Sequence, residues 1–128
     1  MRENLFRGKS LEDGEWVYGY LVAKIYGSHP IIVRSASMED DCSIDFDYVH
    51  VDPATVGRFT NKKDRRGNRI FENDSVRFQR RFVHGGEIIK FGKVVYDEKF
   101  ARFHISDEDG LACWDFYEVE EIEVFGSR

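Results

Sequence analysis

The chain has 128 residues, of which 41% are hydrophobic and 34% are charged, and its net charge is -5. This length fits one domain or two small lobes that share a core, and this balance predicts a folded, soluble protein rather than a disordered one. The negative net charge argues against bulk attraction to nucleic acid or to an anionic membrane surface. Aromatic residues make up 15% of the chain and favour strands, because they pack well across a pleated surface.

The first half of the chain has the pattern of short strands. Asp13-Gly14 marks a tight turn, and the alternating segment 16–22 that follows forms a predicted hairpin with Phe6. Gly19 inside this segment predicts the close approach of another backbone. Further elements are predicted as strands at 31–33 and 43–51, a polar acidic loop at 35–41 and a short helical turn at 52–55.

The second half continues with strands and turns. Several strands of short, similar spacing with turn signals between them indicate a barrel or a sandwich. The segment 119–124 fits either a short strand or one turn of helix. The other predicted strands cover residues 56–60, 69–71, 76–82, 88–97, 100–105 and 112–116.

The stretch 56–78 organises the chain, because it joins an apolar strand, a basic loop at 61–68 and a tight corner, Glu72-Asn73-Asp74. The two corner carboxylates could form a general acid and base pair, or they could cap backbone amides. We favour capping, because no nucleophile or metal ligand is adjacent. The alternation on either side of the corner predicts that Phe71 and Val76 are buried.

Two separated blocks carry a family resemblance. The first is Phe6-Arg7-Gly8-Lys9, followed by Gly14 and Trp16-Val17-Tyr18-Gly19; the second is Asp52-Pro53, Val56, Gly57, Phe59, Thr60, Asp64, Gly67, Ile70, Phe71, Glu72, Asp74 and Val76. In this order they resemble the signature of the YopX family, small proteins of phages and prophages, over most of the first 78 residues. Asn73 stands where glycine is usual, and asparagine tolerates a left-handed backbone. Asn61-Lys62-Lys63 stands where Gly-Leu-Lys is typical.

The resemblance implies an all-β fold with an SH3-like barrel in the second half, a phage or prophage origin, and no settled biochemical activity. With the strand pattern, this predicts an N-terminal strand-rich lobe at residues 1–55 and an SH3-like barrel at residues 56–128.

Positive charge is concentrated in one stretch. Residues 58–93 hold 11 Lys or Arg and 4 Asp or Glu, so the rest of the chain is strongly acidic. Basic and aromatic side chains together can bind nucleic acid by phosphate contact and base stacking. The interleaved Phe59, Phe71, Phe78 and Phe82 are instead expected inside the barrel, because they alternate with period two. The candidate contact residues are Arg58, Lys62, Lys63, Arg65, Arg66 and Arg69.

The acidic segments 39–47 and 107–123 could meet this basic loop in a neighbouring subunit, or they could simply be solvated. We therefore expect a non-enzymatic, phage-derived protein-interaction or self-assembling module, most simply a homo-oligomer. The alternative is a weak nucleic-acid-binding SH3-like module that uses the basic 58–81 face.

Other chemistry has little support in the sequence. Cys42 and Cys113 lie far apart and are expected to be reduced and unpaired, and no histidine has ligand-like spacing with either of them. No catalytic, cofactor-binding or metal-binding residue is therefore assigned. The chain shows no secretory signal and no membrane-spanning apolar run, which predicts a cytoplasmic protein of the bacterial host cell without membrane attachment.

Overall fold

The computed structural model describes residues 4–22, 29–38, 44–81, 85–107, 110 and 112–126. Over these ranges the regular structure consists of antiparallel strands and two short 3-10 helices, which confirms the predicted all-β fold. No helix in this part of the chain has the length and apolar character needed to cross a bilayer. The elements are β1 (Phe6–Lys9), β2 (Trp16–Val22), β3 (Ile31–Met38), β4 (Ile44–His50), η1 (Pro53–Thr55), β5 (Gly57–Lys63), β6 (Arg69–Phe71), β7 (Ser75–Arg81), β8 (Glu87–Asp97), β9 (Arg102–Asp107), β10 (Cys113–Trp114), η2 (Phe116–Glu118) and β11 (Glu120–Gly126).

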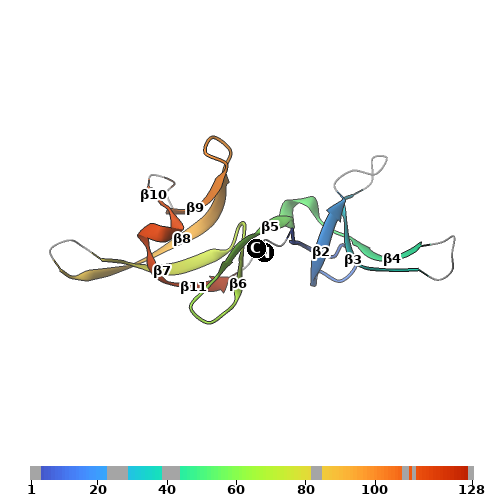
Figure 1. Ribbon diagram of the computed structural model, residues 1–128, viewed down its shortest axis with the longest axis horizontal. Helices are drawn as coiled ribbons and strands as arrows, with labels where there is room; N and C mark the ends of the chain where they lie inside the picture. The colour runs from blue at the N-terminus through green and yellow to red at the C-terminus, as the bar shows by residue number, and fades with distance from the viewer. Residues whose placement is uncertain are drawn as a thin grey trace. The chain divides into compact units, whose positions relative to one another are not determined.

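The chain divides into two compact units, Met1–Phe59 (unit 1) and Thr60–Arg128 (unit 2) (Figure 1). The boundary lies within β5, whereas the sequence placed the division between residues 55 and 56. One sheet has the strand order β4-β3-β2-β1-β5-β6, and the other has the order β10-β9-β8-β7-β11. Each unit has its own cluster of buried apolar side chains.

Unit 1 is built on the predicted hairpin, in which Phe6 pairs with Gly19 and Lys9 with Trp16. A Cβ atom added at Gly19 would collide with the carbonyl oxygen of Val33 on β3, so the expected close backbone approach is confirmed. The inner face of these strands is apolar and not bulky. Its buried residues are Val17, Ile32 and Val51, with Phe6, Leu21, Val49 and Val56 packed against them.

The end of β4 returns to the end of β1. The Leu11 N–H donates to the carbonyl of His50 over 3.0 Å, and the Asp52 N–H donates to that of Lys9 over 2.9 Å. The predicted helical turn is η1, and the Asp52 carboxylate caps it by accepting from the Ala54 N–H over 3.0 Å. These hydrogen bonds join the end of β1 to the end of β4, two segments that are distant in sequence, beside the unit 1 core.

One prediction in unit 1 is wrong. The segment 35–41 was expected to be a loop, but β3 continues to Met38 and pairs with β4. Polar residues form strand here because cross-strand pairing, such as Ser35 with Asp47 and Ala36 with Phe46, satisfies their backbone groups. Residues 39–41 of that loop, and residue 43 of the next predicted strand, lie outside the described ranges.

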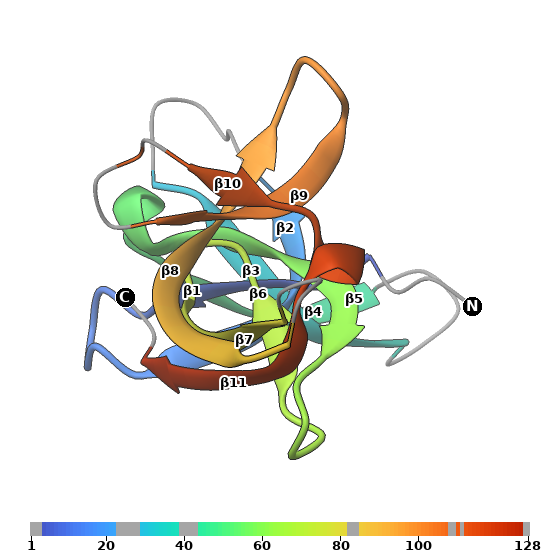
Figure 2. The ribbon, with the colours of Figure 1, turned by 90° about the vertical axis from the view of Figure 1, so that its left-hand side faces the viewer.

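Unit 2 forms around a larger core. Phe78 is fully buried and its ring lies 5.3 Å from that of Trp114. Phe71 and Val76 are buried, as the alternation around the corner predicted. Figure 2 shows β7, β8 and β11 side by side and curving together. The buried cluster around Phe78 consists of Ile70, Val76, Phe78, Val94, Ile105 and Val119.

In unit 2 the end of the last aromatic strand differs from the sequence prediction, and the open alternative at 119–124 is resolved as a strand. The last aromatic strand ends at Trp114, because Asp115 caps the start of η2. The Asp115 N–H donates to Glu118 Oε1, at the end of this 3-10 turn, over 3.0 Å. Segment 119–124 belongs to strand β11, which pairs with β7 through Glu123 and Arg77. The order of the described strands leaves β10 and β11 at opposite edges of an open sheet, so the SH3-like barrel is not confirmed.

Candidate functional site

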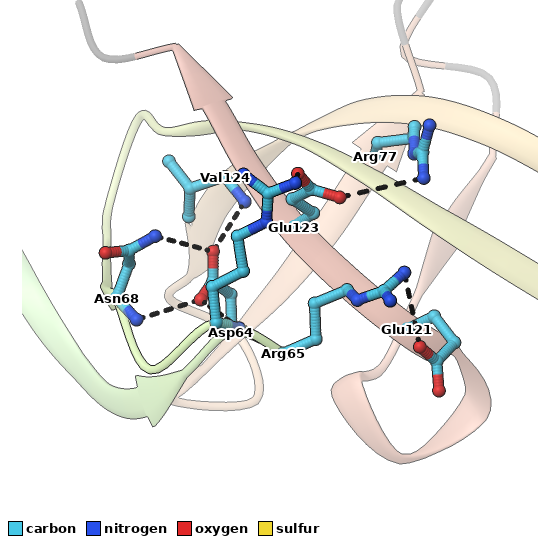
Figure 3. A network of polar contacts seen from close by, with 8 residues as sticks. Asp64, Arg65, Asn68, Arg77, Glu121, Glu123 and Val124 are labelled. Atoms are coloured by element: carbon cyan, nitrogen blue, oxygen red, sulfur yellow. Dashed lines mark hydrogen bonds and ion pairs between the residues drawn. The ribbon is translucent and has the colours of Figure 1, made fainter.

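The basic loop is held from within by an aspartate. One oxygen of the Asp64 carboxylate accepts from the backbone N–H groups of Arg66 and Asn68, over 2.9 and 2.8 Å. Its other oxygen accepts from the Asn68 amide over 3.3 Å and from the Val124 N–H of β11 over 3.0 Å (Figure 3). The Arg65 N–H donates to the Ile122 carbonyl over 2.9 Å. The loop is thereby attached to β11.

These hydrogen bonds determine how Asp64 titrates. Burial by itself raises the pKa of this carboxyl, but the N–H groups of Val124, Asn68 and Arg66 together outweigh burial and hold the pKa below its ordinary value. Asp64 is therefore a charged structural anchor of the loop.

The arginines of the basic stretch meet carboxylates of the same unit. Arg65 lies 3.4 Å from Glu121, and Arg77 lies 3.6 Å from Glu123 (Figure 3). Arg66 also reaches Glu123, at 3.1 Å. Further along β7, Arg80 approaches Glu118 at 3.8 Å. Arg65 and Arg66 of the basic loop thus contact the acidic segment 107–123 within the same unit, whereas the contact considered from the sequence was with a neighbouring subunit.

The other predicted contact residues are spread over exposed positions. Arg58 belongs to unit 1, where its guanidinium lies 5.2 Å from the centre of the Phe6 ring. Lys62 and Lys63 are exposed at the end of β5, and Arg69 is exposed at the start of β6. Of the interleaved aromatics, Phe59, Phe71 and Phe78 are buried as expected, and Phe82 lies outside the described residues.

The Glu72-Asn73-Asp74 corner is a capping site. Asn73 has a φ of 75°, the left-handed conformation that an asparagine tolerates. The Asp74 side chain is completely buried, and its carboxylate accepts from the Phe71 N–H over 2.8 Å. The favoured interpretation, a carboxylate that caps a turn, is confirmed for Asp74.

The remaining titratable groups form no evident centre. In the described part of the chain, no three His, Cys, Asp or Glu side chains are grouped closely enough to hold a metal ion. Cys113 is exposed and carries a free thiol, and Cys42 lies outside the described residues.

Unit 1 exposes aromatic side chains on one face of its sheet. Tyr20 pairs with Val33, and Val33 pairs with Tyr48, so these three residues form a row across β2, β3 and β4. The exposed fractions are 45% for Tyr18, 66% for Tyr20, 56% for Phe46 and 51% for Tyr48. Because side chains alternate along a strand, Trp16, Tyr18 and Phe46 share this face with the row. We call the set Trp16, Tyr18, Tyr20, Val33, Phe46 and Tyr48 the aromatic face.

The rings of the aromatic face lie outside because the space on the inner side of Gly8 and Gly19 is narrow. A Cβ atom added at Gly8 would lie 3.0 Å from Val51 Cβ, and the one at Gly19 would strike the β3 backbone. The inner positions of β2 and β3 therefore hold small or aliphatic residues, and the Phe6 ring of β1 packs against them. At one border of the face, Arg7 and Lys9 on β1 lie over the Trp16 ring, at 4.3 and 5.2 Å from its centre.

The aromatic face ends at β4, which is an edge strand of its sheet. The His50 carbonyl faces this edge, because it accepts from the Leu11 N–H. Backbone groups alternate along a strand, so those of Phe46 and Tyr48 face the same way. A hollow of about 350 Å³ lies beside them, lined by Ser10, Leu11, Glu12, Tyr48, Val49 and His50.

The sequence indicated the alternation of Trp16, Tyr18 and Tyr20, but not which face is exposed. One signal in the sequence could have indicated it. The residues that alternate with these rings, Val17, Gly19 and Leu21, have small or aliphatic side chains, which fit a narrow core. Comparison of the chain with protein-family models, with curated proteins and with solved structures found no match.

Proposed function

We propose that this chain is a non-enzymatic protein-interaction module that binds a polypeptide partner through the aromatic face of unit 1. The observation that carries the proposal is the exposure of Tyr18, Tyr20, Phe46 and Tyr48 on neighbouring strands of one sheet. Single exposed apolar residues need no explanation, but a continuous exposed patch is typical of a binding surface. Tyrosine is also enriched among the residues that contribute most to protein interfaces.

The charge distribution favours a protein partner over nucleic acid. Residues 1–59 hold 6 Lys or Arg and 10 Asp or Glu, so unit 1 repels a polyanion. In unit 2, Arg65 and Arg66 contact carboxylates and are partly neutralised. Weak nucleic-acid binding by the 58–81 face remains the alternative, and it depends chiefly on the exposed Lys62 and Lys63.

The resemblance to the YopX family supplies the setting of this proposal. It implies a phage or prophage origin, and we propose that the protein acts in the cytoplasm of the bacterial host cell. Self-assembly was expected through contacts between the basic loop and the acidic segment 107–123 of another subunit. Because Arg65 and Arg66 contact Glu121 and Glu123 of the same unit, those contacts no longer support an oligomer, and we propose a different protein as the partner.

The test is a selection of ligands from a displayed random-peptide library against the full chain, followed by measurement of each Kd. Tyr18→Ser with Tyr20→Ser should raise the Kd of the selected ligands at least about tenfold, because both rings would be anchors of the interface. The matched control is Phe100→Ser with Tyr117→Ser, which removes two exposed rings of unit 2. It should leave each Kd unchanged.

Two outcomes would overturn the proposed function. One is a selection that yields no ligand sensitive to the Tyr18 and Tyr20 substitutions. The other is tight, salt-sensitive binding of single-stranded DNA or RNA that Lys62→Glu with Lys63→Glu abolishes, which would establish the alternative.

A further inference from the structure

We propose that the partner adds an extended strand to the free edge of β4, and that this strand alternates apolar with basic side chains. The inference rests on the proposed function, and it names the binding mode and the chemistry of the partner. In this mode, backbone hydrogen bonds supply much of the affinity and alternating side chains supply the specificity.

The backbone of β4 is suited to this addition. In the described part of the chain, β4 pairs with β3 alone, apart from the contacts of His50 and Val51 with Ser10 and Leu11. The N–H and C=O groups of Phe46 and Tyr48 point to the open edge. An unpaired edge is a template for a further strand.

The hollow beside this edge shows where such a strand would enter. Leu11 and Glu12 form one side of it, and Tyr48 and His50 of β4 form another. Leu11 is 49% exposed, so an apolar side chain of the partner could cover it. A strand that runs along Phe46 and Tyr48 would pass directly into this hollow.

The side chains of β4 determine what the added strand must carry. Phe46 and Tyr48 point to the aromatic face, so residues opposite them should be apolar. Asp45 points to the other face and should lie opposite a lysine or arginine. Asp47 points the same way but already contacts Arg34, at 2.8 Å. Asp45 and Glu12 therefore carry the negative charge that is available to the partner.

The same charges disfavour a second copy of this chain. In an antiparallel pair of two β4 strands, a register that places Phe46 opposite Phe46 places Asp45 opposite Asp47. The register that places Phe46 opposite Tyr48 places Asp47 opposite Asp47. Like charges in directly opposed positions destabilise a strand pair. Acidic residues on an edge strand are a known means of preventing self-pairing.

The experiment uses the full chain and a short synthetic peptide in which lysine alternates with valine. Binding is measured by fluorescence anisotropy, and amide chemical shifts locate it. We expect the largest shifts at Phe46 and Tyr48, with slowed hydrogen exchange of their amides, and none at Arg65 or Arg66. A peptide N-methylated at the residues that face β4 should not bind, because it lacks the donors.

Charge reversal tests the specificity. Glu12→Lys with Asp45→Lys should weaken binding of the lysine–valine peptide at least about tenfold. The same variant should bind a glutamate–valine peptide that the wild type does not bind. Both residues are exposed, so the fold should be retained. The matched control is Glu98→Lys with Glu120→Lys, which changes the same charge on unit 2 and should leave both affinities unchanged.

Several results would overturn the proposal. They are no binding of the lysine peptide, equal binding of the N-methylated peptide, or indifference to charge reversal. If the wild type sediments as a dimer and Asp45→Lys changes that dimerisation, a second copy of the chain occupies this edge instead. If ligands from the displayed library depend on Tyr18 and Tyr20 but not on Asp45, the proposed function stands and the strand addition fails.

Discussion

Unit 2 buries Phe78 against Trp114 and pairs several of its arginines with its own carboxylates. Unit 1 builds its core from Val17, Ile32 and Val51, with the Phe6 ring packed against them, and it exposes the tyrosines of β2 and β4. Unit 2 also exposes apolar side chains, but Phe91 and Phe125 contact each other at 5.5 Å between ring centres. Phe100 belongs to a turn and Tyr117 to η2, so neither lies on a strand.

The difference shows that a run of charge and a run of aromatics are poor guides to function until their partners are known. The basic stretch was the most conspicuous charged feature of the sequence, yet its loop contacts β11 and serves to hold unit 2 together. The alternation along β2 placed Trp16, Tyr18 and Tyr20 on one face, and that face is the exposed one. Changes in each unit can test this contrast, and Trp16 and Trp114 report on the units separately.

The largest effect is expected from the unit 2 core. Phe78→Ala should lower the free energy of unfolding of unit 2 by about 3–5 kcal/mol, because it removes a fully buried ring. Denaturant titration followed by Trp114 fluorescence, in a Trp16→Phe background, measures this change. The buried Phe71 should behave similarly when truncated to alanine. An unchanged midpoint for either variant would place that ring outside the core.

A smaller loss is expected when the narrow interior of unit 1 is filled. Gly19→Ala adds a Cβ that collides with the Val33 carbonyl, and overpacking of this kind costs about 1–3 kcal/mol. Trp16 fluorescence in a Trp114→Phe background follows unit 1. The control is Tyr20→Ala on the same strand, which should change stability by about 0.5 kcal/mol or less because the ring is exposed. Equal losses for the two variants would contradict a close-packed interior behind an exposed face.

The anchor of the basic loop should depend on pH. Asp64→Asn should cost about 1–3 kcal/mol at neutral pH, because several N–H groups lose a charged acceptor. The folded-state pKa of Asp64 is depressed, so its contribution is complete above the unfolded pKa of about 3.9 and is lost as pH falls through the folded pKa.

The measurement for Asp64 is the unfolding free energy of wild type and variant from neutral pH down through the carboxyl range. The difference between them should shrink as the pH falls. Glu98→Gln, at an exposed turn, serves as the control and should show little difference at any pH. A difference that stays constant with pH would show that the charge of Asp64 does not hold the loop.

The smallest effect is expected from the ion pairs. Arg65→Glu with Arg66→Glu should cost about 1 kcal/mol or less per pair, because both arginines are largely exposed. Sedimentation at low and high salt should show no change in assembly. Lys62→Glu with Lys63→Glu makes the same change in charge on β5 and should behave alike in sedimentation. If only the arginine variant shifted toward monomer, this result would support a contact of Arg65 and Arg66 with another subunit.

Much of the fold could be predicted because strand formation is local. The alternation at residues 16–22 and 88–97, the Asp13-Gly14 turn and the helical turn after Asp52 all depend on neighbouring residues. The burial of Phe71 and Val76 also followed from alternation on either side of the corner. Where local preference was weak, as at Ser35–Met38 and at 112–124, pairing with another strand decided the structure, and the prediction failed or stayed open.

The candidate site depended on what lies across the sheet. Alternation showed that Trp16, Tyr18 and Tyr20 share a face. The same alternating pattern is expected whether that face is buried or exposed. Only the tertiary structure decided between them, because β3 approaches β2 so closely at Gly19 that the opposite face carries the large rings. In the same way, the sequence by itself determined that Arg65 and Arg66 are charged. Whether they would meet a partner, or Glu121 and Glu123, depended on β11 folding back beside the loop, a contact between residues far apart in the chain.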